Sequence, residues 1–388
     1  MQYLILPSPS ILRPMNRSLV QCFVLLGALN IVGIVSPLGA QEARDTTYHF
    51  TTLAGSTTGH RDGIGERAQF HAPEGIALDR QGNVYVTEYR NNGVRKITPD
   101  GKVSTLAGVS GELGHRDGAG EQALFNRPHG LTVDSVGNVY VCDMHNSVIR
   151  KIAPNGEVVT LAGAPTRAGT QDGRGAEARF NQPEDVAVDQ RGTLYVADTY
   201  NYTIRRITPQ GQVSTLAGQA GTPGSADGPG PEARFNKPVG LAIDRHGTLY
   251  VADADYDGDQ PGNCMIRKVT PEGRVTTLAG RAGQDSTADG KGDQARFDRP
   301  VGIAVAPDGT LYVADTEADL IRKVSPAGVV TTIGGQYRKE NFQNGVGDQA
   351  HFNDPQAIAI DPDGHLYVAD TFNDRIRKAS PTIPRKHE

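Results

Sequence analysis

Short apolar runs alternate with turn residues along most of the chain, at a spacing typical of β-strands. In one stretch four such runs occur in a row, at residues 185–189, 194–198, 204–207 and 213–217. The connections within each pair of runs are short and contain glycine, which predicts antiparallel neighbours joined by tight turns. No intervening segment is long and periodic enough to be a crossover helix, so a parallel sheet is excluded.

The same group of four runs recurs six times. Successive copies are 55 residues apart, except for one interval of 62. A repeat of this length indicates a repeat architecture. Four antiparallel strands per unit, repeated radially, predict an all-β fold, a six-bladed β-propeller of four-stranded antiparallel blades. Each copy is marked by one phenylalanine: Phe70, Phe125, Phe180, Phe235, Phe297 and Phe352.

The two ends of the repeat predict how the ring closes. The sixth copy stops at residues 376–378 and lacks a fourth strand, whereas residues 48–54 form a spare strand ahead of the first copy. We therefore expect the N-terminal strand to complete the last blade, which removes the exposed sheet edges of an open array. This assigns residues 41–381 to a single propeller domain and residues 382–388 to a C-terminal tail.

Three motifs in the repeat resemble those of a known family. Pro-x-Gly-Ile-Ala-x-Asp, Gly-Asn-x-Tyr-Val-x-Asp and Asn-x-x-Ile-Arg-Lys-Ile are similar to NHL repeats, over about residues 48–381. The resemblance implies a six-bladed NHL propeller of the secreted bacterial type. It specifies the fold better than the function, because the family includes protein binders, RNA binders, receptor sensor domains and a few metal-dependent enzymes.

The first 40 residues lie outside the repeat. They contain two basic residues and no acidic ones, followed by an apolar run at 22–35 and small residues at 38–40. This pattern predicts a secretory signal peptide over residues 1–40 and a secreted or periplasmic protein. An uncleaved membrane anchor is the alternative, although the run is short for a spanning helix. The start of translation is open between Met1 and Met15.

Charge and cysteine content limit the function. Removal of residues 1–40 would take away two basic residues, so the formal net charge would change from −5 to −7. A nucleic-acid partner normally requires a basic face, so we expect none. Cys142 and Cys264 alone would remain, which excludes a disulfide scaffold. We expect a monomer without a membrane span after signal cleavage.

Polar residues present in every copy are interpreted as scaffold. A carboxylate ends each second strand and an arginine follows it, and such a sixfold set indicates structural pairs. The Asp-Gly-x-Gly stretches recur in nearly every copy without a following Lys-Ser/Thr, so tight turns with positive φ explain them better than phosphate binding does. The arginines are Arg95, Arg150, Arg205, Arg267, Arg322 and Arg377.

Positions that differ between copies are candidates for function. The residue after the proline of the first strand should surround the mouth of the axial channel. Three consecutive blades offer oxygen and imidazole ligands there, which could hold a divalent cation that activates a water. A solvated polar channel mouth is the alternative, and two blades offer valine. In order, the ring is Glu74, His129, Glu184, Val239, Val301 and Gln356.

A second ring should lie further from the axis on the same face. It combines the residue after each second strand with the residue before each first-strand proline. Its mixed charge with aromatics suits a protein or glycan ligand better than RNA, since aromatics and arginines act as anchors. The predicted ligand-binding residues are Arg90, His145, Tyr200, Glu317, Phe372, Arg127, Lys237 and Arg299.

The one insertion, in the fourth copy, is acidic. Asp255, Asp257 and Asp259 alternate there, and a glycine stands sixth from Asp253, as at the start of a calcium loop. Cys264 stands where a calcium loop has its bidentate glutamate, so a solvated acidic loop is the alternative. No cofactor is predicted outright; the candidates are Ca²⁺ here or another divalent cation at the channel mouth.

These patterns favour a binding module over an enzyme. The hypothesis is an exported NHL propeller that binds a protein or glycan through its variable-loop face. The alternative is a metal-dependent lyase or lactonase-like hydrolase that uses the axial channel mouth. No catalytic residue is assigned, because no Gly-x-Ser-x-Gly, Cys-x-x-Cys or His-Glu-x-x-His motif occurs.

Overall fold

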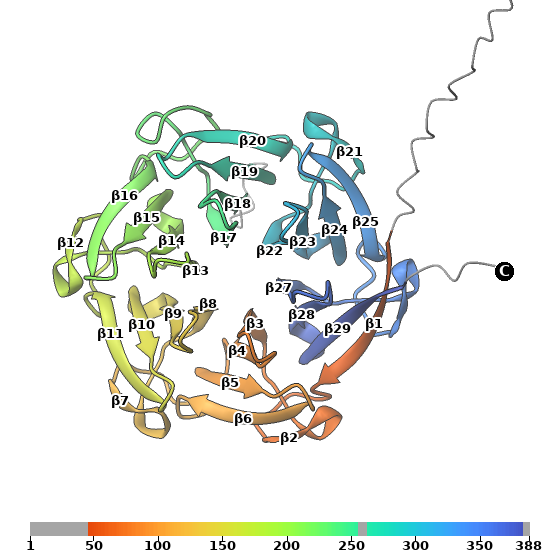
Figure 1. Ribbon diagram of the computed structural model, residues 1–388, viewed down its shortest axis with the longest axis horizontal. Coiled ribbons are helices and arrows are strands. Elements are labelled where there is room, and N and C mark those ends of the chain that lie inside the picture. The colour runs from red at the N-terminus through yellow and green to blue at the C-terminus, as the bar shows by residue number, and fades with distance from the viewer. Residues whose placement is uncertain (1–45, 255–261, 383–388) are drawn as a thin grey trace, which may run out of the picture. The chain divides into compact units, whose positions relative to one another are not determined.

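The computed structural model describes residues 46–254 and 262–382. In these residues six antiparallel sheets are arranged as blades around a central axis (Figure 1). The predicted six-bladed all-β propeller is confirmed. The predicted signal peptide falls outside the described residues, as does most of the predicted tail at 382–388, so both stay predictions.

Each blade contains four main strands, numbered here from the axis outward. Blade one has β3 (Pro73–Leu78), β4 (Val84–Glu88), β5 (Gly93–Ile97) and β6 (Lys102–Ala107). Blade two has β8 (Pro128–Val133), β9 (Val139–Asp143), β10 (Val148–Ile152) and β11 (Glu157–Gly163). Blade three has β13 (Asp185–Val188), β14 (Leu194–Asp198), β15 (Thr203–Ile207) and β16 (Gln212–Gly218).

The remaining blades follow the same plan. Blade four has β17 (Pro238–Ile243), β18 (Leu249–Asp253), β19 (Met265–Val269) and β20 (Val275–Gly280). Blade five has β22 (Pro300–Val305), β23 (Leu311–Asp315), β24 (Leu320–Val324) and β25 (Val329–Gly335). Blade six has β27 (Pro355–Ile360), β28 (Leu366–Asp370), β29 (Arg375–Thr382) and, as its fourth strand, β1 (Thr47–Ala54).

Five sheets carry an additional outer strand that the sequence pattern did not predict. It is two residues long and comes from the Asp-Gly-x-Gly stretch. Blade four has a single bridge there, between Gly228 and Val275. The short strands are β2 (Gly63–Ile64), β7 (Gly118–Ala119), β12 (Gly173–Arg174), β21 (Gly290–Lys291) and β26 (Gly345–Val346).

Single turns of 3-10 helix occur at two places in the repeat. One set follows the short outer strands: η1 (Gly65–Arg67), η2 (Gly120–Gln122), η4 (Gly175–Glu177), η6 (Gly292–Gln294) and η8 (Gly347–Gln349). The other set follows second strands: η3 (Met144–Asn146), η5 (Thr199–Asn201), η7 (Thr316–Ala318) and η9 (Thr371–Asn373).

The ring closes through the N-terminal strand, as predicted. Strand β1 pairs antiparallel with β29, and Figure 1 shows the two lying side by side. The Phe50 ring is fully buried and meets Phe352 edge to face at a centroid distance of 5.1 Å. Strand β29 continues through Pro381, further than the sequence suggested. A proline is accepted there because β28 begins only at Leu366, opposite Ala379, so no neighbour on that side needs an N–H from Pro381.

The core consists of six clusters, each between two neighbouring blades. The apolar faces of adjacent sheets meet, so both faces of the middle strands are buried. Between blades one and two, Tyr85 and Val94 of one sheet pack against Leu131, Val141 and Ile152 of the next. This explains why second strands such as Leu194–Asp198 are apolar almost without interruption.

Candidate functional site

The connections define two different ends of the propeller. The links between second and third strands, and between one blade and the next, form one end, which we call the loop face. The tight turns within the first and last strand pairs form the other, which we call the turn face. Loops on a rigid scaffold are the usual place for binding residues.

The repeated arginines are confirmed as scaffold. Arg150 is fully buried, and its guanidinium contacts Asp143 and Asp117, each at 2.7 Å, while stacking over Phe125 at 4.7 Å. Burial raises the pKa of Asp143 to about 6, while Arg150 opposes that rise. The Asp-Gly-x-Gly aspartates, predicted from the sequence to be turn residues only, are the second partner of five of the six arginines, and Asn344 takes their place beside Arg377. These polar groups are therefore consumed by the fold.

A repeated hydrogen bond between blades positions the loop face. The last residue of the turn after a second strand is left-handed, and its side chain accepts the N–H of the residue before the next blade's proline. Asn92 accepts from Arg127 at 3.0 Å, and Asp319 accepts from Asp354 at 2.8 Å. Because these bonds link adjacent blades, the residues at the channel mouth are held on a rigid frame.

The residues that follow the first-strand prolines surround the channel mouth, which is the position that the sequence predicted. Glu74 Oε2 lies 3.0 Å from His129 Nε2, and both side chains are largely buried. His129 Nδ1 lies 3.1 Å from the backbone oxygen of Glu184. Glu184, Val239 and Val301 are buried, and Gln356 is 7% exposed. The first three residues therefore interact with one another in consecutive blades.

Burial controls ionisation at this mouth. It raises the pKa of Glu74 well above the usual carboxyl range, with further increases from the charges of Asp354 and Glu184. It also lowers the pKa of His129 to about 4. Burial therefore disfavours the ionised form of both groups.

This arrangement does not fit a bound metal ion. Both ring nitrogens of His129 already have partners, and Glu74 favours its protonated form, whereas metal ligands must be deprotonated. Among residues 46–254 and 262–382, three potential ligand atoms converge only at Asp361, Asp363 and His365, not at Glu74, His129 and Glu184. A metal at the channel mouth stays a prediction.

The Asp361 group lies on the turn face and is explained by the turn itself. The Asp361 carboxylate accepts the backbone N–H groups of Asp363 and His365, and lies 2.9 Å from His365 Nδ1. Asp134 and Asp244 accept equivalent backbone N–H groups in other blades. The cluster is a repeated turn cap with one additional histidine.

Several predicted ligand residues already have partners in neighbouring blades. The guanidinium of Arg127 lies over the Tyr89 ring at 5.1 Å, and the Lys237 ammonium lies over Tyr200 at 4.7 Å. Lys237 is 3% exposed, so its side chain offers little surface to a ligand. The His145 ring meets Tyr89 edge to face at 6.3 Å. These residues form a belt of inter-blade contacts.

The remaining predicted ligand residues surround a hollow between blades five, six and one. Its volume is about 430 Å³, and Arg299 forms an ion pair with Glu317 at its wall. The Phe372 ring is 58% exposed at its rim. We call this cavity the mouth hollow. Its lining includes Tyr89, Arg90, Arg299, Glu317, Asp319, Glu340, Asp354, Phe372 and, at the channel mouth, Glu74 and Gln356.

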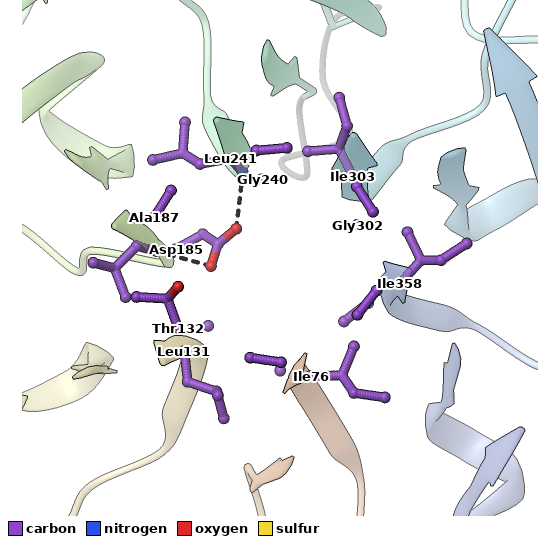
Figure 2. A pocket seen from close by; sticks show the side chains of 18 of the residues that line it. Ile76, Leu131, Thr132, Asp185, Ala187, Gly240, Leu241, Gly302, Ile303 and Ile358 are labelled. Atoms are coloured by element: carbon purple, nitrogen blue, oxygen red, sulfur yellow. Dashed lines mark hydrogen bonds between the residues drawn. The ribbon is translucent and has the colours of Figure 1, made fainter. Parts of the chain in front are cut away.

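The axial channel contains a carboxylate that the sequence analysis missed. Figure 2 shows Asp185 among apolar side chains such as Leu131, Leu241 and Ile303, in a cavity of about 340 Å³. Burial raises the pKa of Asp185 to about 7. Four blades have glycine at this position and the sixth has Ala357. Comparison of copies one position further along the strand could have found it.

Two further predictions concern the fourth copy. Asp255, Asp257 and Asp259 lie outside the described residues, so the calcium loop stays a prediction. Asp253, just before them, is fully buried and pairs with Arg267 at 2.9 Å, as scaffold. Cys142 and Cys264 are both buried and free, so these two do not form a disulfide.

Comparison with known proteins supports the repeat assignment. A family model described as NHL repeat matches residues 125–152, 180–207, 297–323 and 352–378. Each matched stretch runs from the buried phenylalanine to the third strand of a blade.

Two curated relatives share much of the chain. Protein SUPPRESSOR OF QUENCHING 1, chloroplastic, from Arabidopsis thaliana is 30% identical over 286 residues, which is 70% of this chain and 26% of that protein. NHL repeat-containing protein 2 from Bos taurus is 29% identical over 285 residues, 66% of this chain and 38% of that protein. The chain thus spans less than half the length of either relative.

Solved structures share the architecture. A structural genomics protein of unknown function from Bacteroides thetaiotaomicron has a TM-score of 0.66 at 24% identity, covering 86% of this chain and 76% of that one. Virginiamycin B lyase from Staphylococcus aureus has a TM-score of 0.53 at 15% identity, covering 87% and 100%. At these identities the likeness shows the fold alone. The described residues include no helix with the length and hydropathy needed to cross a bilayer.

Proposed function

This chain belongs to the NHL-repeat family, and we propose that it is an exported binding module whose loop face holds a protein or glycan partner. The observation that carries the proposal is the mouth hollow, of about 430 Å³. Its walls come from residues that differ between blades, whereas the repeated polar residues are engaged in the scaffold. Export rests on the signal-peptide pattern in residues 1–40.

The hollow has the composition of a recognition site. An exposed aromatic, Phe372, stands at its rim, and the charged residues Arg90, Arg299 and Glu317 surround it. Aromatic and arginine side chains are the usual anchors of protein interfaces. The turn face, by contrast, carries carboxylates such as Asp361 that cap their own turns.

Site-specific photo-crosslinking tests the proposal. A photoreactive residue at position 372 would sample the mouth hollow, and one at the exposed Gln190 would sample the turn face. We expect a partner from the native extracellular or periplasmic fraction to crosslink from position 372 and not from 190. Crosslinking from position 190 alone would mean that the partner binds the turn face, which would contradict the proposal.

Point variants then measure the contribution of the hollow. Phe372→Ala and Glu317→Lys should each weaken binding of the captured partner by roughly tenfold, as expected for an interface anchor. Both residues are exposed, so each change should alter stability by no more than about 0.5 kcal/mol. The matched controls Gln190→Lys and Gln210→Lys lie on exposed turn-face positions and should leave binding unchanged.

A second candidate function is supported by the Glu74–His129 pair. Burial favours the protonated carboxyl of Glu74 and the neutral imidazole of His129, and such a pair would offer a proton donor and a proton acceptor. If the protein is a lyase or a lactonase-like hydrolase, Glu74→Gln and His129→Ala should abolish turnover of a panel of lactones, whereas Phe372→Ala should only modulate it. If the parent protein turns over no lactone, with or without added divalent ions, the enzyme hypothesis is rejected and the binding function remains.

A further inference from the structure

The mouth hollow has an excess of acidic side chains. Five carboxyl groups and two guanidiniums line it; Glu74 among them favours its protonated form, and the Arg299 guanidinium is already paired with Glu317. Two further basic residues of the loop face, Arg127 and Lys237, are engaged with tyrosine rings, and Arg127 lies over Tyr89 at the wall of the hollow. The carboxyl groups are those of Glu74, Glu317, Asp319, Glu340 and Asp354.

These carboxylates repel one another. The pKa of Asp354 is raised by burial and by the charges of Glu317 and Glu340. The pKa of Asp319 rises to about 7, through burial and through Glu340 and Asp354. A cation placed among them would relieve this repulsion and favour their ionised forms.

A second, independent feature of the hollow is a buried side-chain oxygen, Gln356 Oε1, that lacks a hydrogen-bond donor in the part of the chain that the structure describes. Gln356 is 7% exposed, and its Nε2 donates to Asp354 Oδ2 at 2.7 Å, which fixes the orientation of the amide. Its Oε1 is buried and has no hydrogen-bond partner among the described residues. An unpaired buried acceptor costs about 1–3 kcal/mol, so a ligand N–H at this point would be stabilised.

The size of the hollow favours an organic cation over a bare metal ion. Among the described residues, the carboxyl groups that line the hollow do not form a set of three whose oxygens lie close enough together to hold a metal ion. A volume of about 430 Å³ is large enough for a long side chain with its terminal charged group. The exposed ring of Phe372 at the rim offers an apolar surface to the stem of that side chain.

We propose that the mouth hollow receives a lysine or arginine side chain from a basic segment of a protein partner. The terminal nitrogen atoms donate to Asp354 and to Gln356 Oε1, and the stem packs on Phe372. The acidic net charge of the chain, −5, is complementary to such a partner. This inference rests on the proposed function and names the chemistry that the same site recognises.

Matched peptides test this chemistry directly. The probes are two fluorescein-labelled pentapeptides, Gly-Gly-Arg-Gly-Gly and the same peptide with citrulline, which keeps the shape of arginine without its charge. We expect the arginine peptide to bind the full chain at least tenfold more tightly in fluorescence polarisation at low ionic strength. Equal affinity for the two peptides would overturn the proposal.

Matched variants locate the binding. Asp354→Asn removes one charge from the hollow while keeping an acceptor for Gln356 and a residue type that tolerates left-handed backbone. It should weaken the arginine peptide about fivefold or more, whereas Asp363→Asn, an exposed aspartate on the turn face, should have no effect. Arg90→Glu replaces a positive charge in the hollow with a negative one and should tighten binding. Equal losses from Asp354→Asn and Asp363→Asn would mean non-specific attraction and overturn the site.

The outcomes separate this inference from the function on which it rests. If a glycan partner crosslinks from position 372 and the protein binds the arginine and citrulline peptides equally, the proposed binding function stands and the basic-segment ligand is refuted. A partner that crosslinks only from position 190 would refute both.

Discussion

The carboxylate of Asp185 joins blade three to blade four. Its Oδ2 accepts the backbone N–H of Leu241 at 2.8 Å, and its Oδ1 accepts that of Val186 at 2.8 Å (Figure 2). No other blade has a carboxylate at this position. The interface between blades three and four is therefore stabilised by a buried acidic side chain inside the channel.

This acid should make stability depend on pH. The folded-state pKa, about 7, lies above the value of ~3.9 for an unfolded aspartate. The folded protein thus binds the proton more tightly, so the contribution is full below pH ~4 and is lost as the pH rises toward 7. Between pH 5 and pH 8 we expect the Tm of the parent to fall by roughly a few degrees relative to Asp185→Asn.

Thermal melts of both proteins across that pH range check the prediction. Asp363→Asn, an exposed aspartate, serves as the control and should track the parent. A constant Tm difference between the parent and Asp185→Asn from pH 5 to pH 8 would mean that Asp185 does not titrate in this range.

Ring closure should depend on β1. Phe50→Ala removes a fully buried ring and should cost about 3–5 kcal/mol of the free energy of unfolding. Thr51→Ala, at an exposed position of the same strand, should cost less than about 0.5 kcal/mol. Deletion of residues 46–54 should abolish cooperative melting, because it opens an edge on β29. A deletion variant that melts like the parent would contradict closure through this strand.

The fit of β1 against blade five gives an independent test. Blade five has Gly334 where the other complete blades have alanine, and a Cβ there would lie 2.6 Å from Phe50 Cε2. Gly334→Ala should therefore destabilise the protein by roughly 1–3 kcal/mol, as overpacking does. In the double variant with Phe50→Ala the added methyl should cost little, which denaturant titration of the four proteins would measure.

The scaffold arginines predict a graded response in blade two. Asp143→Ala leaves the fully buried Arg150 without its inner partner and should cost about 3–5 kcal/mol. Asp117→Asn should cost less than about 1 kcal/mol, because Asn344 performs the same role for Arg377 at 3.0 Å in blade six. Similar costs for the two changes in urea unfolding would argue against this division of roles.

The channel-mouth pair predicts indifference to metals. Since both nitrogens of His129 are engaged and Glu74 favours its protonated form, millimolar Zn²⁺ or Mn²⁺ at pH 7 should leave the Tm of the parent within about one degree. Scanning calorimetry with and without metal checks this. A metal-dependent rise that His129→Ala removes would support the metal-dependent enzyme instead.

The sequence by itself determined the architecture. Six copies of one strand pattern, a sixth copy short of a strand and a spare strand at residues 48–54 led to a closed six-bladed ring, because repeated apolar faces can be buried only against each other. The comparison of copies also separated the scaffold arginines from the variable loop face. These features are local or periodic, so they are visible along a single chain.

Only the tertiary structure decided how the variable residues meet. Arg127 and Lys237 resemble Arg299 in the sequence, yet two are engaged with tyrosines and the third faces the mouth hollow. The shifted pKa values of Glu74 and His129 and the hydrogen bond from Leu241 to Asp185 were equally hidden, because both depend on burial and on contacts between blades. Residues 55 or more positions apart become neighbours only when the blades pack against one another, and their charges and pKa values follow from that packing.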